Sequence, residues 1–250
     1  MTKGCPLIIF LSVLLLFLPG CATIYNPATE RQEFVFIDTQ QEVALGQKLS
    51  YQIQGKYVLI HNNDEKRVQE IGKRIASVSD RKDINYNFFV VKDKNINAFA
   101  LPGGYVYVHT GLLNFIKTDD ELACVIGHEI GHIAARHPIK RLEAVYGYSL
   151  ISAIVFRDSS DFSSIQEITN TVFSLIVLGY GREDELLADR LGIKYSRKAG
   201  YNPSAMVDFL KRLKVIENKK VLVPVWARTH PDIDERIKIA EQEILIYNGR

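Results

Sequence analysis

Two histidines and a glutamate stand together at His128, Glu129 and His132, in the order H-E-x-x-H. On a helix, residues four positions apart lie one above the other on the same face, so both imidazoles can point at one ion. Zinc hydrolases use this arrangement to hold Zn²⁺. The spacing therefore predicts a metal site. The alternative is a pair of histidines on an amphipathic helix that are satisfied by ordinary hydrogen bonds.

An acidic group later in the chain can complete this site. Zinc in a hydrolase usually has three protein ligands and one open position, so two histidines leave room for an acid. Glu185 and Asp189 are four residues apart and share one face of a predicted helix. Glu185 can be the third ligand, and Asp189 can accept a hydrogen bond from the second nitrogen of a ligand histidine. Glu183 and Asp184 compete for the ligand role, and a solvated helix start would explain the acids without a metal.

The H-E-x-x-H residues need a helix to position them, and the sequence predicts one over residues 118–138. Thr118 and Glu121 match a T-x-x-E capping box, and Pro138 cannot continue a helix. The apolar residues between these ends predict that most of the helix is buried.

Upstream of this helix, the apolar pattern changes from a helical period to a strand period. Residues 86–92, 98–101 and 105–109 are rich in aromatic and β-branched side chains, and Pro102-Gly103-Gly104 separates the last two runs. We expect a small mixed or antiparallel sheet, joined to the helix through the turn Thr110-Gly111. One strand is expected to line the cleft, where an extended peptide could add as a further strand; a purely structural hairpin is the alternative. The residues of this candidate substrate strand are Asn97, Ala98, Phe99 and Ala100.

Helical periodicity and capping residues predict further helices on both sides of the metal helix. Their ranges are 42–54, 62–77, 182–200, 202–217 and 231–247. Two apolar stretches at 144–156 and 171–178 are too short to span a bilayer. They predict a helical hairpin that either covers the metal cleft as a lid or belongs to the ordinary core.

The first twenty residues have the features of a lipoprotein-type signal peptide. Lys3 gives a positive start, residues 7–18 form an apolar run, and Leu18-Pro19-Gly20-Cys21 closes it. The tetrad resembles a bacterial lipobox, so Cys21 is the predicted lipidation site and residues 21–40 a lipidated tether. Ala22 in the next position is typical of an outer-membrane address. A plain secretory signal with an incidental cysteine is the alternative.

Composition and charge favour one compact domain that does not bind nucleic acid. The formal net charge is +2 and falls to +1 without residues 1–20, which contain one lysine and no acid. Such a balance gives no electrostatic case for nucleic acid. With Cys21 lipidated, Cys124 would have no disulfide partner, and its place in a buried helix indicates a small core residue. We therefore expect one domain over residues 41–250.

Several motifs, all in order, resemble those of peptidase family M48, the zinc metallopeptidases that include HtpX, Oma and the CAAX prenyl proteases. They are His128-Glu129-x-x-His132, Glu185-x-x-Ala188-Asp189, His230-Pro231-x-x-x-x-Arg236, Asn97-Ala98-Phe99-Ala100-x-Pro102-Gly103-Gly104 and Gly111-Leu112-Leu113. The resemblance covers about residues 60–245 and is far more specific than H-E-x-x-H alone. In plan, the chain resembles most closely the periplasmic lipoprotein members, such as LoiP.

The resemblance implies an α+β fold, mainly helical, of the zincin type (gluzincin-like), with a small β-sheet beside the H-E-x-x-H helix. It implies one Zn²⁺ per chain held by His128, His132 and Glu185, with Glu129 as the general base that takes a proton from a zinc-activated water. His230 matches a family histidine that either donates a hydrogen bond to the oxyanion or takes the open zinc position in a self-inhibited state. The sequence leaves both roles open.

The remaining histidines and Arg236 receive no role in the chemistry. His61, His109 and His137 have no second ligand at a useful spacing, so we expect them at helix caps or on the surface. Arg236 is expected to be structural.

By this resemblance the protein would be a membrane-anchored zinc endopeptidase on the periplasmic face of the bacterial outer membrane. It would hydrolyse misfolded or unassembled envelope proteins and would reach the membrane through the lipid on Cys21. An alternative from another class is a latent or non-catalytic, zinc-stabilised chaperone or binding lipoprotein in which His230 blocks the metal. A third is a structural lipoprotein without a metal.

Overall fold

The computed structural model describes residues 22–145, 179–219 and 224–248. The predicted signal peptide, Cys21 and the predicted helical hairpin beyond residue 145 lie outside these ranges. Within them, no helix combines the length and the apolar character that crossing a membrane requires.

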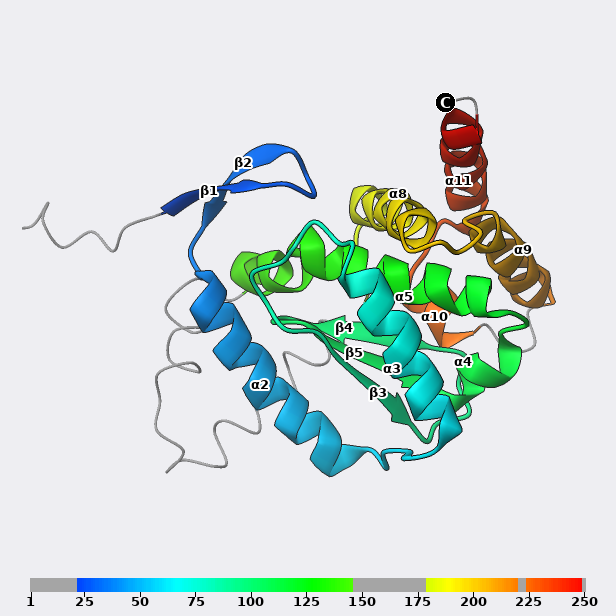
Figure 1. The fold of residues 1–250 in the computed structure, drawn as a ribbon, viewed down its shortest axis with the longest axis horizontal. Helices are drawn as coiled ribbons and strands as arrows, with labels where there is room; N and C mark the ends of the chain where they lie inside the picture. Colours follow the sequence, from blue (N-terminus) through cyan, green and yellow to red (C-terminus); the bar gives the residue numbers. More distant parts are fainter. Residues whose placement is uncertain (1–21, 146–178, 220–223, 249–250) are drawn as a thin grey trace, which may run out of the picture.

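A small mixed sheet lies behind the central helices (Figure 1), as the sequence predicted. Its strands are β3 (Asn87–Val91), β4 (Ala98–Leu101) and β5 (Tyr105–His109), in the order β3-β5-β4. β5 pairs in parallel with β3 and antiparallel with β4. The turn between β4 and β5 needs its two glycines, because Gly103 and Gly104 have φ values of 73° and 97°. Among the described residues, β4 pairs only with β5 and is the last strand at one side of this sheet.

The metal helix of the prediction is α5 (Asp119–Ala134), and α8 (Arg182–Lys198) packs along it. The two backbones touch because small residues face each other. A Cβ on Gly127 would lie 3.0 Å from the carbonyl oxygen of Gly192, and one on Gly131 would lie 2.9 Å from that of Ala188. Larger side chains would push the helices apart. This contact brings the first turn of α8 beside the H-E-x-x-H segment.

The predicted end of α5 at Pro138 is wrong. The helix stops at Ala134, Ala135 caps it, and Arg136 has a left-handed φ of 61°. The chain is helical again from His137 to residue 145, with Pro138 in the first turn, where a missing N–H costs nothing. The change of direction at Arg136 turns the following residues back toward the end of α5.

The predicted capping box at the start of α5 forms only in part. The hydroxyl of Thr118 accepts a hydrogen bond from the backbone N–H of Glu121 at 3.2 Å. The carboxylate of Glu121 accepts instead from the backbone N–H of Lys117 and pairs with Arg212 of α9 (Ala205–Asn218). A tertiary ion pair therefore replaces one half of the local motif.

Other helices surround this centre. Those predicted from periodicity are α2 (Thr39–Lys56), α3 (Asn63–Ala76), α9 (Ala205–Asn218) and α11 (Ile233–Asn248). Two short helices were not predicted: α4 (Thr110–Phe115) replaces the simple turn expected after β5, and α10 (Val225–Thr229) lies before α11. The mainly helical α+β class predicted from the sequence is confirmed.

Within the predicted tether of residues 21–40, the chain forms a hairpin. β1 (Ala22–Asn26) pairs antiparallel with β2 (Arg31–Val35). Lys140 holds the hairpin against the body through an ion pair with Glu33 at 2.6 Å. The polar sequence of this segment could not predict an ion pair with a residue more than a hundred positions later in the chain.

Candidate metal centre

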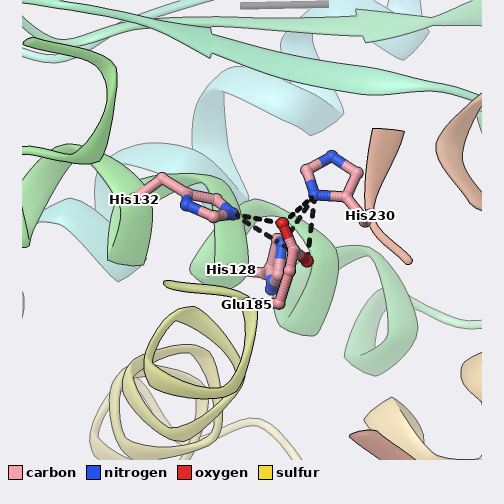
Figure 2. A group of neighbouring side chains, drawn as sticks. All are labelled: His128, His132, Glu185 and His230. Atoms are coloured by element: carbon pink, nitrogen blue, oxygen red, sulfur yellow. Dashed lines mark hydrogen bonds and ion pairs between the residues drawn. The ribbon is translucent and has the colours of Figure 1, made fainter. Parts of the chain in front are cut away.

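Four side chains from three parts of the chain converge in the interior (Figure 2). His128 and His132 come from α5, Glu185 from the first turn of α8, and His230 from the segment between α10 and α11. All four are buried. One nitrogen or carboxylate oxygen of each lies within 4.8 Å of those of the others, so the group could hold a metal ion.

The three predicted ligands meet at distances that suit zinc. Nε2 of His128 lies 3.0 Å from Nε2 of His132, and the Glu185 carboxylate lies 3.5 Å from each of these nitrogens. Ligand atoms about 2.0–2.2 Å from a tetrahedral ion would be about 3.3–3.6 Å apart. Two imidazoles and a carboxylate are also donors that Zn²⁺ accepts. The residues present therefore fit the metal, and their roles as ligands stay predictions.

Asp189 lies next to His128, and its role in orienting that ring stays a prediction. Its Oδ1 is 2.9 Å from Nδ1 of His128, which leaves Nε2 of that ring facing the other candidate ligands. Arg236 donates two hydrogen bonds of 2.7 Å to the same carboxylate and lies 3.1 Å from Glu185. Burial alone would raise the pKa of Asp189, but Arg236 and His128 hold it below its usual value.

Arg236 was expected to be structural, and it supports several residues of the cluster. It is fully buried, its guanidinium lies 4.5 Å from the centre of the Trp226 ring, and it donates to the backbone carbonyl of His230 at 3.1 Å. One cation therefore joins Asp189, Glu185 and the His230 segment. The sequence motif contained this arginine, but its burial could not be predicted from the motif.

Glu129 lies beside the cluster and has no hydrogen-bond partner for either carboxylate oxygen among the described residues. Its Oε1 lies 3.6 Å from Nε2 of His230. Burial raises the pKa of Glu129, and His230 and His128 oppose this shift. A buried carboxylate with free oxygens and a raised pKa has the properties of a proton acceptor.

His230 occupies the fourth position of the cluster. Its Nδ1 lies 3.0 Å from Glu185 Oε1 and 3.3 Å from Nε2 of His128. Burial would lower the pKa of His230, but the carboxylates of Glu185 and Glu129 raise it above its ordinary value. The segment is held in place because Gly179, with a φ of 85°, packs so closely on Thr229 that a Cβ would lie 2.2 Å from its carbonyl oxygen.

The prediction that His137 lies at a cap or on the surface is wrong. Its side chain is 3 % exposed, and its Nδ1 lies 2.8 Å from Nδ1 of His132. Burial lowers the pKa of His137 to about 3. His109 is buried but stands at the N-cap position of α4, without a capping hydrogen bond from its side chain, and His61 is exposed and pairs with Glu65. The only sequence signal for His137 was the proline that follows it and marks a change of direction.

A narrow cavity connects the cluster to the sheet. It is lined by residues 97–100 of the candidate substrate strand together with Glu129, Tyr180, Thr229 and His230. Its volume of about 10 Å³ is close to what one water molecule needs. Tyr180, which the sequence did not single out, stacks on His132 with ring centres 3.9 Å apart. Its buried hydroxyl has no hydrogen-bond partner among the described residues.

The two acids that compete with Glu185 do not enter the cluster. Glu183 is exposed, and Asp184 lies 3.3 Å from Nε2 of His137. Of the three consecutive acids, Glu185 alone belongs to the potential metal group.

The sequence of this domain matches a known family. Residues 62–244 match the profile of Peptidase family M48. This range contains the H-E-x-x-H segment, the acids of α8 and His230.

Among curated relatives, the mitochondrial metalloendopeptidase OMA1 of Schizosaccharomyces pombe is 27% identical over 223 residues, which are 87% of this chain and 65% of that protein. The beta-barrel assembly-enhancing protease of Escherichia coli K12 is 27% identical over 208 residues, 79% of this chain and 42% of the relative. The OMA1 metalloendopeptidase of Bos taurus is 31% identical over 170 residues, 62% and 31% of the two chains. The chain thus spans about one third to two thirds of the length of these relatives.

Proposed function

The chain belongs to peptidase family M48, and from this membership we propose that it is a zinc-dependent endopeptidase acting on misfolded or unassembled proteins of the bacterial cell envelope. The observation that carries the proposal is the meeting of Glu185 with Nε2 of both His128 and His132, 3.5 Å from each. The three side chains come from α5 and α8, which pack closely because glycines lie where the two helices touch. Together they can bind one metal ion.

His128, His132 and Glu185 would hold the zinc. When bound, Zn²⁺ polarises a carbonyl oxygen and lowers the pKa of water. Glu129 would take the proton from the attacking water and give it to the leaving amine, a role supported by its free, buried oxygens and its raised pKa. Asp189 would keep His128 in the tautomer that presents Nε2, because it accepts from Nδ1.

The substrate would bind as an extended chain along β4. Residues 97–100 line the cavity beside Glu129, and β4 is the last strand of its sheet among the described residues. An extended peptide can pair with such an edge, whereas a folded protein has already paired its backbone groups. This preference supports unfolded or unassembled proteins as the substrate class. The name of the Escherichia coli relative, a beta-barrel assembly-enhancing protease, points to the same class.

An unfolded outer-membrane β-barrel protein, diluted from urea, is expected to be cleaved at least about tenfold faster than the same protein folded in detergent, because only the unfolded chain can reach β4. Gel analysis of the two digestions over time measures the ratio. The proposed substrate class is refuted if both forms are cleaved at the same rate.

A second candidate function, a latent peptidase, is favoured by the position of His230. Its Nδ1 joins the three candidate ligands, and the cavity has room for about one water molecule. We propose that His230 closes the fourth metal position at rest and must move before a substrate binds. This assigns His230 the inhibitory role rather than that of an oxyanion donor.

The substitution His230→Ala is therefore expected to raise hydrolysis of an unfolded protein by about tenfold if about one molecule in ten is open at rest. The rate is measured with a fluorogenic unfolded substrate, and His109→Ala, another buried histidine, is the control. A loss of activity in His230→Ala alone would instead support the oxyanion role.

We also propose that lipid on Cys21 anchors the protein to the periplasmic face of the outer membrane. The lipobox-like tetrad and Ala22 support this location. The likeness to the lipoprotein members of the family stays a prediction.

A further inference from the structure

A chain of three side chains runs from His132 to the protein surface. Nδ1 of His132 lies 2.8 Å from Nδ1 of His137, and Nε2 of His137 lies 3.3 Å from Oδ1 of Asp184. The two histidines are buried, whereas the side chain of Asp184 is 45% exposed. His132 thus contacts a second imidazole at the position where His128 contacts the carboxylate of Asp189.

The order of these groups determines where the protons lie. An ionised carboxylate can only accept, so the carboxylate of Asp184, 3.3 Å from Nε2 of His137, favours the proton of His137 on Nε2. A neutral imidazole carries one N–H and one lone pair, so Nδ1 of His137 is then an acceptor. The short contact between the two Nδ1 atoms therefore needs the proton of His132 to be on Nδ1. Nε2 of His132 is left with its lone pair facing Glu185.

The rings have little freedom to adopt another arrangement. Tyr180 stacks on the face of His132, with an angle of 20° between the rings. His137 is held by the left-handed turn at Arg136, and Asp184 by the first turn of α8. α8 thus provides both Glu185 and the outer end of this chain.

We infer that His137 is a positioning residue that fixes the tautomer of His132, so that Nε2 of His132 is free to bind the metal. This inference rests on the proposed metal site and adds a residue that the H-E-x-x-H motif does not contain. His137 acts only through His132, because its own ring nitrogens are engaged by His132 and Asp184.

The test compares two substitutions in the full chain. His137→Ala removes the acceptor, so the ring proton of His132 can then lie on either of its two nitrogens. Zinc affinity is therefore expected to fall about 10- to 100-fold. His137→Asn keeps a carbonyl oxygen as acceptor and is expected to stay within about threefold of the wild type. Both affinities are measured by competition with a chromogenic zinc chelator. His109→Ala is the control for loss of a buried histidine elsewhere.

The outcomes separate this inference from the proposed function. Absence of zinc binding in the wild type would refute the metal site itself. Equal affinity of the wild type and His137→Ala, or equal weakening by His137→Ala and His137→Asn, would overturn the role of His137 and leave the metal site standing. If His137→Ala does not fold, nitrogen NMR of the metal-free wild type can show which ring nitrogen of His132 carries the proton. A proton on Nδ1 of His132 supports the inference, and a proton on Nε2 overturns it.

Discussion

Glu129→Gln is expected to slow peptide hydrolysis by about 10²- to 10⁴-fold while zinc stays bound. The substitution keeps the shape of the side chain but removes the proton acceptor. Glu129 is not among the candidate metal ligands, and its carboxylate oxygens make no hydrogen bond within the described part of the chain. The loss is therefore expected in the rate of the chemical step, measured with a fluorogenic unfolded protein at saturating concentration.

Glu183→Gln is the matched control for this change. It makes the same chemical replacement at an exposed acid near the start of α8, and the rate should be unaffected. Equal rates for Glu129→Gln and the wild type would remove Glu129 from the reaction, even if zinc were present in both proteins.

Glu185→Ala is expected to weaken zinc binding by more than about 10²-fold, because the loss of a ligand should exceed the loss of a supporting residue. Two imidazoles would remain, next to the buried cation of Arg236, which lies 3.1 Å from the missing carboxylate. Arg236 would keep Asp189 as a partner but lose Glu185, and its less compensated positive charge would repel a metal ion. Competition with a chelator measures the affinity, with Glu183→Ala as the control. An affinity unchanged by Glu185→Ala would leave the third ligand unassigned.

The sequence predicted those parts of the fold that depend on short-range patterns. The three strands of the central sheet and the start of α5 follow from alternation, glycines and a capping threonine, all of which act within a few residues. The helical spacing of Glu185 and Asp189 was sufficient to place both on one face of α8. It could not show that Glu185, rather than Glu183 or Asp184, enters the cluster, because that depends on how α8 is rotated against α5.

The errors in the prediction come from long-range packing. His137 was expected at a cap or on the surface because it has no ligand spacing, but the turn at Arg136 folds it back onto His132. Arg236 was expected to be structural, but the sequence could not show that two buried carboxylates hold it inside, where arginine is rarely found. The close approach of α5 and α8 depends on glycines that face each other from distant parts of the sequence.

The central claim is that Glu185 and the two histidines of α5 bind one zinc ion, and metal analysis of purified protein tests it most directly. The full chain, prepared without added metal, should contain about one zinc per molecule in the wild type and in Glu183→Ala. Glu185→Ala should contain less than about a tenth of that amount. Equal zinc in all three proteins, or none in the wild type, would contradict the account.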